Sequence, residues 1–306
     1  MNSIEYSKVF QNALDQQMIA QSTSGWMELN ADLVKYEGGD EVKVPRIVME
    51  GLADYDRENG FQRGNIQLSW DTYKLTKDRG RSFSFDAMDV DETNMVVSAA
   101  SVMAEFQATE VIPEVDAYRY SRIAQLAIEN NRVRSGIVLD STNVLDALLE
   151  DIYAIQDEVG DNIPLVIALN MQNARILNTA DRIQKTLDTT NFQKGEVDMT
   201  VRSLDGNPII KVPSSRMKTS YIFKDGKTTN QESGGFEASP DAKNINWIIA
   251  AKNVPIAISK TSKVRIFEPN FNIQSDAWKV DYRKYHDLWI QKNKMKGVFV
   301  NIKETL

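Results

Sequence analysis

Residues 83–128 read FSFDAMDVDETNMVVSAASVMAEFQATEVIPEVDAYRYSRIAQLAI, and this stretch decides the fold. Apolar residues recur at spacings of three and four through most of it, which is typical of one face of an amphipathic helix. The pattern predicts a helix over 89–128, several times longer than the roughly three turns of an average globular helix. Pro113 lacks the N–H that an α-helix needs, so we expect a kink or a break there.

Carboxylates gather at the start of this predicted helix, and two more lie beside the proline. The first group is Asp86, Asp89, Asp91 and Glu92. Such oxygens could hold a magnesium ion, but Asp89 and Glu92 have the spacing of a capping box, and acids suit the positive end of a helix. We therefore predict a helix cap. Glu110 and Glu114 could form an acid–base pair, although exposed carboxylates beside a kink are commonplace.

The segments on either side of the helix have different periods. Residues 3–21 predict a short amphipathic helix, and residues 40–87 alternate with the period of strands. Gly60 and Gly64 mark the tip of a long two-stranded arm, which needs a further strand, a helix or a neighbouring subunit beside it because an isolated hairpin is marginally stable. It could equally lie within the chain's own sheet.

The second half of the chain mixes helices and strands. The pattern predicts a helix over 145–159, a buried strand at 165–170, a helix around 174–177 and a hairpin turning at Asp205-Gly206. Residues 224–244 are polar and glycine-rich and are expected to form a loop, and strands return from 245 to the end of the chain. The predicted fold class is α+β.

Composition restricts the class of protein. The 306 residues are 42% hydrophobic and 26% charged, which is ordinary for a globular chain. A net charge of -7 argues against binding duplex DNA by neutralising phosphates. The chain has no cysteine, so disulfides, cysteine zinc sites and thiol nucleophiles are excluded. No secretory signal and no run of 18 apolar residues is present, which predicts a soluble cytosolic protein with no membrane partner.

Residues with catalytic potential are sparse. His286 is the only histidine, so it cannot complete a triad or a typical zinc site and is expected to be structural. The glycines at 38–40 and 233–235 and the serines at 214–215 lack the patterns of a phosphate loop or a nucleophile elbow. A basic run on one strand predicts either protection of a sheet edge or a charge contact between subunits, and it comprises Lys74, Lys77, Arg79 and Arg81. We predict no catalytic, cofactor-binding or metal-binding residues.

Five pieces of sequence in this order resemble the major capsid proteins of tailed bacteriophages, which have the Hong-Kong-97-like fold. They are WDTYKLTKDRGRSFSFDAMDVDET (70–93), VIPEVDAYRYSRIA (111–124), VRSLDGNPIIKVPSSRM (201–217), INWIIAAKNVPIAISK (245–260) and RIFEPNFNIQSDAWKVDYRKYHDLWIQKNKMKGVFVNIK (265–303). The resemblance implies an N-terminal arm at 1–39 and an extended loop hairpin at 40–87. It also implies a peripheral domain with a spine helix at 88–141 and 251–306, and an inserted axial domain at 142–250.

The resemblance also implies a role and partners. The chain would form pentamers and hexamers of itself and build an icosahedral shell around double-stranded phage DNA, contacted non-specifically. Scaffold, portal and head-decoration proteins would be its other partners, and it would assemble in the host cytoplasm and reside in the virion. The arm begins almost at once, which implies a separate scaffold protein or a mature chain. We can place no Lys–Asn pair for a covalent cross-link, so none is predicted.

Two alternatives remain open from the sequence. One is an encapsulin-like shell of the same fold, which is a cellular nanocompartment holding an enzyme cargo. The other is a cytosolic α+β enzyme that uses the carboxylates near Asp89.

Overall fold

The computed structural model describes residues 21–33, 35–36, 40–58, 60–86, 98–180, 187–194, 197–267 and 277–306. The predicted N-terminal helix, apart from its last residue, and the predicted cap at Asp89 and Glu92 lie outside these ranges. Within them the fold is α+β, as predicted: a long helix, three sheets of three or more strands and a small two-stranded sheet.

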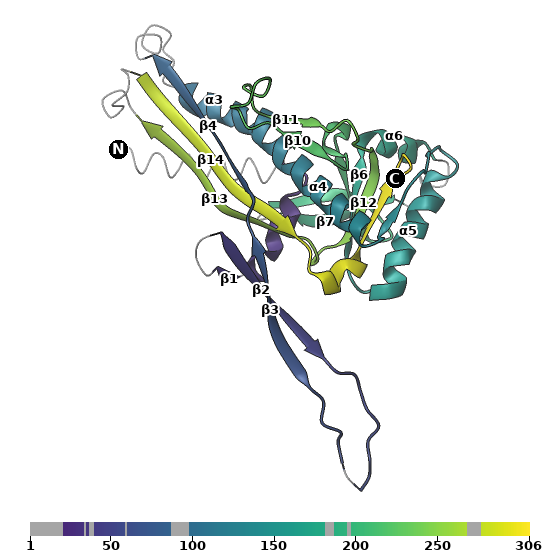
Figure 1. The fold of residues 1–306 in the computed structure, drawn as a ribbon. Coiled ribbons are helices and arrows are strands. Elements are labelled where there is room, and N and C mark those ends of the chain that lie inside the picture. Colours follow the sequence, from purple (N-terminus) through teal and green to yellow (C-terminus); the bar gives the residue numbers. More distant parts are fainter. Residues whose placement is uncertain are drawn as a thin grey trace.

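The long helix consists of three consecutive parts (Figure 1). They are α3 (Ser98–Phe106), a π-helical turn η3 (Gln107–Val111) and α4 (Ile112–Glu129). The helix does not break at Pro113. The N–H of Ile112 instead donates to the carbonyl of Gln107 across a π turn, and the Thr109 hydroxyl donates to the Glu105 carbonyl at 2.9 Å. A π turn inserts one residue into the helix, which accommodates a residue without an N–H.

The first half of the long helix packs on a three-stranded antiparallel sheet. This sheet has the order β13 (Ile256–Phe267), β14 (Ala277–Trp289) and β4 (Lys77–Asp86). The residues that join helix and sheet are apolar and buried, and they are Met103, Val111, Val115, Val264, Val280 and Tyr282. Residues 256–267 form one strand with an irregularity between Ser259 and Thr261.

The second half of the helix contributes to the largest core, which surrounds a seven-stranded mixed sheet. The strands follow the order β5 (Val133–Arg134), β15 (Val298–Ile302), β12 (Ile245–Ala251), β6 (Leu165–Asn170), β9 (Asn207–Val212), β8 (Val197–Leu204) and β7 (Leu187–Lys194). Helices α5 (Val144–Val159) and α6 (Met171–Thr179) share this core. The hairpin turn at Asp205-Gly206 is confirmed, with both residues at positive φ.

In this sheet, one edge of the part formed by residues 142–250 pairs with a strand from outside that range. β15 pairs with β12, and β5 pairs with β15, so the sheet includes residues from before and after the predicted insertion. The division of the chain into domains therefore stays a prediction.

A third sheet projects from the body (Figure 1). It consists of β1 (Lys35–Tyr36), β2 (Glu41–Met49) and β3 (Ile66–Lys74), and residues 50–65 connect the far ends of β2 and β3. The alternating residues after 76 leave this hairpin, because β4 pairs with β14 instead. Two shorter strands, β10 (Tyr221–Phe223) and β11 (Phe236–Ala238), form a hairpin over the helix, and β11 lies within a segment expected to be a loop.

Three short 3-10 helices complete the described elements: η1 (Gly25–Leu33), η5 (Ser214–Arg216) and η7 (Lys292–Gly297). None of the helices that the structure describes is long and apolar enough to cross a lipid bilayer.

Candidate interaction surfaces

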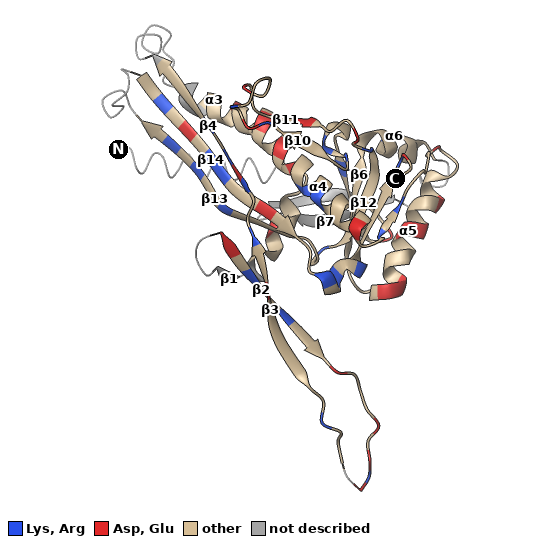
Figure 2. Ribbon diagram, viewed as in Figure 1, with Lys and Arg blue, Asp and Glu red and all other residues tan. Residues whose placement is uncertain are grey.

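The hairpin of β2 and β3 exposes apolar side chains along most of its length. The cross-strand pairs Met49–Ile66 and Ile47–Leu68 lie at its outer end, and the four side chains are 56–70% exposed. Trp70 is 46% exposed. Figure 2 shows that the strands carry little charge and that acidic and basic residues gather in the loop beyond them. An apolar surface of this extent is uncommon on a monomer and marks an interaction site.

The foot of the hairpin, in contrast, is fixed to the body. Val42, Val44 and Leu75 are buried in a small core with Ile256, Ile258 and Trp289 of the three-stranded sheet. Tyr73 stacks on Trp289 with ring centroids 5.5 Å apart. The hairpin therefore has one anchored end and one end without cover from its own chain.

The loop at the outer end presents an apolar cluster among acidic residues. Leu52 and Phe61 are 107% and 87% exposed, and the ring of Phe61 meets the ring of Tyr55 edge to face at 4.9 Å. Asp56 and Gly60 form a β-bridge that closes the loop, with φ of 80° at Gly60. The predicted hairpin tip at Gly60 is confirmed. We call residues 50–64 the hairpin tip below.

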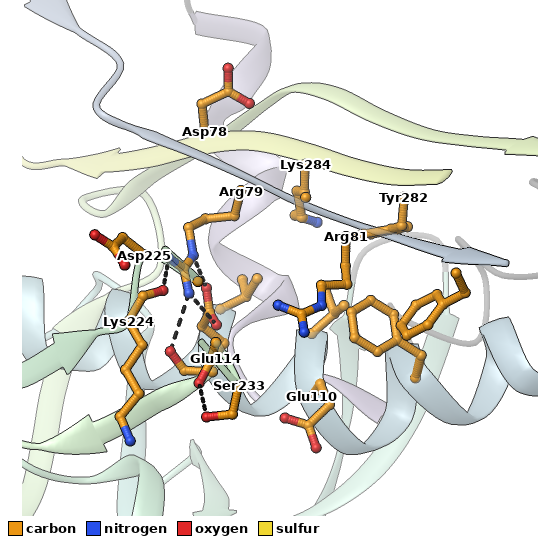
Figure 3. A pocket seen from close by; sticks show the side chains of 18 of the residues that line it. Asp78, Arg79, Arg81, Glu110, Glu114, Lys224, Asp225, Ser233, Tyr282 and Lys284 are labelled. Atoms are coloured by element: carbon orange, nitrogen blue, oxygen red, sulfur yellow. Dashed lines mark hydrogen bonds and ion pairs between the residues drawn. The ribbon is translucent and has the colours of Figure 1, made fainter. Parts of the chain in front are cut away.

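A pocket of about 510 Å³ lies between β4, β14, the π turn and the loop from β10 to β11 (Figure 3). On one side Arg79 forms an ion pair with Glu114 at 2.7 Å and donates to the carbonyls of Lys224 and Gly235. The opposite side of the pocket is apolar and includes Phe83, Phe106 and Val111. The pocket thus joins a polar wall to an apolar one.

Arg81 occupies the middle of this pocket (Figure 3). Gly226 and Gly234 border its guanidinium group at φ of 73° and 69°, and a Cβ added to either would lie 3.4 or 3.2 Å from Nη1. Among the described residues, Arg81 donates to the carbonyl of Glu232, at 3.3 and 3.4 Å. The glycines leave room for this guanidinium group, whose hydrogen-bond acceptor among the described residues is a neutral backbone carbonyl.

The predicted basic run is confirmed in part as the edge of a sheet. β4 is an edge strand of its sheet, but Lys77 and Arg79 point toward the long helix rather than outward. Lys77 lies over the rings of Tyr118 and Phe223, at 5.2 and 4.5 Å from their centroids. Burial lowers the pKa of Lys77, and the charge of Arg79 lowers it further. Lys74 lies on β3 instead.

The two carboxylates considered as an acid–base pair have different surroundings. Glu114 is paired with Arg79, whereas Glu110 has no ion pair among the contacts of the described residues. Both line the pocket, as do Ser233, Gly234 and Gly235. Ser214 donates to Asn170 at 2.7 Å and holds the start of α6. Across the ranges that the structure describes, no group of three or more His, Cys, Asp or Glu side chains could hold a metal ion.

His286 is buried against the ring of Tyr118, at 5.5 Å between ring centroids. Burial lowers its pKa well below the usual value, and the charges of Lys284, Arg119, Lys77 and Arg79 lower it further. Its Nδ1 has no hydrogen-bond partner. A buried neutral imidazole surrounded by cations is consistent with the structural role expected from the sequence.

A buried charged network, which no sequence pattern indicated, holds residues 22–28 against α4. The carboxylate of Asp116 accepts hydrogen bonds from the hydroxyls of Ser22, Thr23 and Ser24, from the backbone N–H groups of Thr23 and Ser24, and from Arg216. Burial raises the pKa of Asp116, but these hydrogen bonds outweigh burial and lower it overall. One helical turn further on, Arg119 pairs with Glu28. The segment that follows residue 21 is therefore fixed at a defined place on the helix.

Comparisons with known proteins identify the fold. No protein-family model matches the sequence, and no curated protein matches it either. Solved structures do match. The mature capsid of bacteriophage PhiM1 is 11% identical, with a TM-score of 0.55 over 87% of this chain and 82% of that one. The capsid of Cyanophage P-SCSP1u is also 11% identical, with a TM-score of 0.54 over 88% and 84%.

A further match is a virus-like particle from Pyrococcus furiosus. It is 12% identical, with a TM-score of 0.51, and the match covers 97% of this chain and 99% of that one. At these identities the likeness concerns the fold. The chain has the fold of the phage capsid proteins and the virus-like particle that it matches, with an exposed hairpin, a long helix against a three-stranded sheet and a second, larger sheet.

Proposed function

We propose that this chain is the major capsid protein of a tailed bacteriophage, which assembles with copies of itself into an icosahedral shell around double-stranded DNA. The observation that carries the proposal is the projecting hairpin of β2 and β3, whose outer half is apolar and uncovered. Its foot is packed against the body, so the outer half projects from an anchored base. A surface of this kind requires a partner in the functional state.

The fold similarity supports copies of the same chain as that partner. The capsid structures of bacteriophage PhiM1 and Cyanophage P-SCSP1u match most of this chain. The exposed apolar hairpin differs in chemistry from the other surfaces described above. A contact between the hairpin of one copy and a different surface of the next copy would join unlike patches. Such heterologous contacts generate rings when the rotation closes. Pentamers and hexamers are the rings that a closed icosahedral shell needs.

The remaining partners follow from this role. A scaffold protein would direct assembly, a portal protein would occupy one vertex, and head-decoration proteins would bind the outer surface. Packaged DNA would be contacted non-specifically, since the net charge of -7 does not favour strong neutralisation of phosphates. The protein would assemble in the host cytoplasm and remain in the virion.

A nanocompartment shell that encloses an enzyme cargo is the second candidate. The observation that favours it is the match to the virus-like particle from Pyrococcus furiosus, which covers nearly the whole of both chains.

Expression of the full chain, with and without a scaffold protein encoded beside it, tests the proposal. We expect closed particles in negative-stain electron microscopy and a peak of megadalton size in size-exclusion chromatography. A chain that stays monomeric in both cases would contradict both candidates. Particles recovered from the native source separate them, because a phage head contains DNA and a nanocompartment contains a protein cargo.

A further inference from the structure

The sheet face that looks onto the long helix carries a row of basic side chains. In the pairing of β4 with β14, Arg79 is opposite Lys284 and Lys77 is opposite His286, and Arg81 follows two residues after Arg79. Directly opposite residues point to the same side of a sheet. Arg79, Arg81, Lys284 and His286 accordingly all line the pocket described above. The strand register therefore concentrates cations on one wall of that pocket.

The chain neutralises most, but not all, of the charges at the entrance of the pocket. Arg81, Lys227 and Glu110 line it, are exposed, and form no ion pair within the described ranges. Two cations against one acid leave an excess of positive charge there. The other charged groups of the entrance are occupied: Arg79 pairs with Glu114, Lys224 with Glu237 and Asp78 with Arg283, and Asp225 accepts hydrogen bonds from its own turn.

The inner wall of the pocket holds a polar atom without a partner. His286 is 2% exposed, and its Nδ1 has no hydrogen-bond partner although the residue lines the pocket. Burial lowers the pKa of His286, and the charges of Lys284, Arg119, Lys77 and Arg79 lower it further, which indicates a positive potential at this wall. A buried polar atom that lacks a partner costs free energy. An anionic ligand with a polar group near this wall would therefore be stabilised.

The opposite wall is apolar. Phe83 and Phe106 meet edge to face with ring centroids 4.9 Å apart, and Val111 lines the same side. The cavity volume of about 510 Å³ lies in the range of sites for small molecules. A ligand that fits both walls has a charged head and a hydrocarbon part.

We propose that this pocket binds a small monocarboxylate with an aromatic or branched hydrocarbon part. The carboxylate faces Arg81, in the space that Gly226 and Gly234 leave around the guanidinium group, and the hydrocarbon part packs on Phe83 and Phe106. A planar carboxylate matches the two parallel N–H groups of an arginine. A single negative charge suits the small excess of positive charge at the entrance, whereas Glu110 disfavours a dianion.

The site belongs to one chain. Its walls come from β4, β14, the long helix and the loop between β10 and β11 (Figure 3). Binding therefore needs no second copy, and the inference does not depend on the role of the protein in a shell.

Titration of the full unassembled chain with phenylacetate tests the site. His286 is the only histidine, so isotope-labelled histidine gives a single imidazole NMR signal that reports on the inner wall. At fixed pH and ionic strength, this signal should shift and saturate with a dissociation constant of about 1 mM, the order expected for a ligand of this size. Phenethylamine, which carries a cationic head, and acetate, which lacks the ring, should each bind at least about tenfold more weakly.

Two variants of opposite sign test the charge preference. Arg81→Gln removes the cation that faces the carboxylate and should weaken phenylacetate binding by about tenfold. Glu110→Gln removes a like charge at the entrance and should strengthen it by about twofold. Lys292→Gln, at an exposed position that does not line the pocket, is the matched control and should leave binding unchanged.

Several results would overturn the inference. They are the absence of a saturable shift with phenylacetate, equal binding of the three compounds, unchanged or tighter binding by Arg81→Gln, and weaker binding by Glu110→Gln. The proposed function is judged separately, by particle formation. A chain that binds phenylacetate as expected but forms no particles would contradict the shell role and leave the pocket assignment in place.

Discussion

At the scale of single residues, the most constrained atoms are the carboxylate oxygens of Asp116. They accept hydrogen bonds from residues 22–24 and an ion pair from Arg216, and the side chain is fully buried. Removal of this carboxylate would leave several buried donors and a cation without their acceptor.

Asp116→Ala should therefore lower the free energy of unfolding by about 3–5 kcal/mol. Urea denaturation of the unassembled chain, followed by tryptophan fluorescence, measures the change. Asp241→Ala, at an exposed position, is the control and should change stability by less than about 0.5 kcal/mol. Equal stability of the two variants would show that the network does not hold residues 22–24 to the helix.

His286 predicts a pH dependence of stability. Its folded pKa is lowered well below the unfolded value of about 6.5, so the unfolded chain takes up a proton more readily than the folded chain. The stability is fully present above pH 6.5 and falls as the pH decreases, by up to about 1.4 kcal/mol per pH unit. Denaturation curves between pH 7 and pH 5.5 measure it.

His286→Gln removes the titrating group and should flatten this dependence. The shape of the curve, rather than its absolute height, is the readout, because the substitution also changes packing. A slope between pH 7 and pH 5.5 that is the same in both proteins would assign the proton uptake to another group. Carboxylates with lowered pKa values, such as Asp116 and Glu28, act at lower pH.

At the scale of elements, the long helix connects the two large sheets. Its first half packs on the sheet of β13, β14 and β4, and its second half lies in the core of the seven-stranded sheet. The π turn before Pro113 lies between the two halves, and Val111 of that turn is itself part of the first core. The change from one packing partner to the other follows the proline, between Val115 of the first core and Tyr120 of the second.

Met103, in the first half of the helix, is completely buried. Met103→Asp would place an unpaired charge between helix and sheet, which costs several kcal/mol, and should leave the chain insoluble or without a cooperative unfolding transition. Ser101→Asp, at an exposed position of the same helix, is the control and should fold normally. Soluble, cooperatively folded Met103→Asp protein would mean that this face of the helix is not core.

At the scale of the whole molecule, we expect the outer part of the β2–β3 hairpin to be dispensable for the folded body but necessary for assembly. Its outer residues contribute to none of the three buried cores. The register pairs Met49 with Ile66, so a single glycine in place of 50–64 leaves Gly-Asn65 as a two-residue hairpin loop, a favoured length and composition.

This replacement should leave the unfolding free energy unchanged to within about 1 kcal/mol and should abolish particle formation. Circular dichroism and urea denaturation test the first expectation, and size-exclusion chromatography with electron microscopy tests the second. Wild-type yields of normal particles would contradict the role of the hairpin in assembly. Loss of the folded body would instead mean that the tip stabilises its own chain.

The sequence by itself determined the elements. The spacing of apolar residues predicted the long helix, the strands at 165–170 and 245–251 and the turn at Asp205-Gly206, because local periodicity and turn chemistry are properties of neighbouring residues. It also predicted the α+β class and resembled phage capsid proteins, two of which have solved structures that share this fold.

The tertiary structure alone decided which elements meet. Residues 66–74 and 77–86 alternate in the same way, yet the first strand pairs with β2 in the hairpin and the second pairs with β14. Hydrogen bonds in the pocket around Arg81 and in the Asp116 network join residues up to 156 positions apart in the chain. Such contacts depend on long-range packing, which no local pattern encodes.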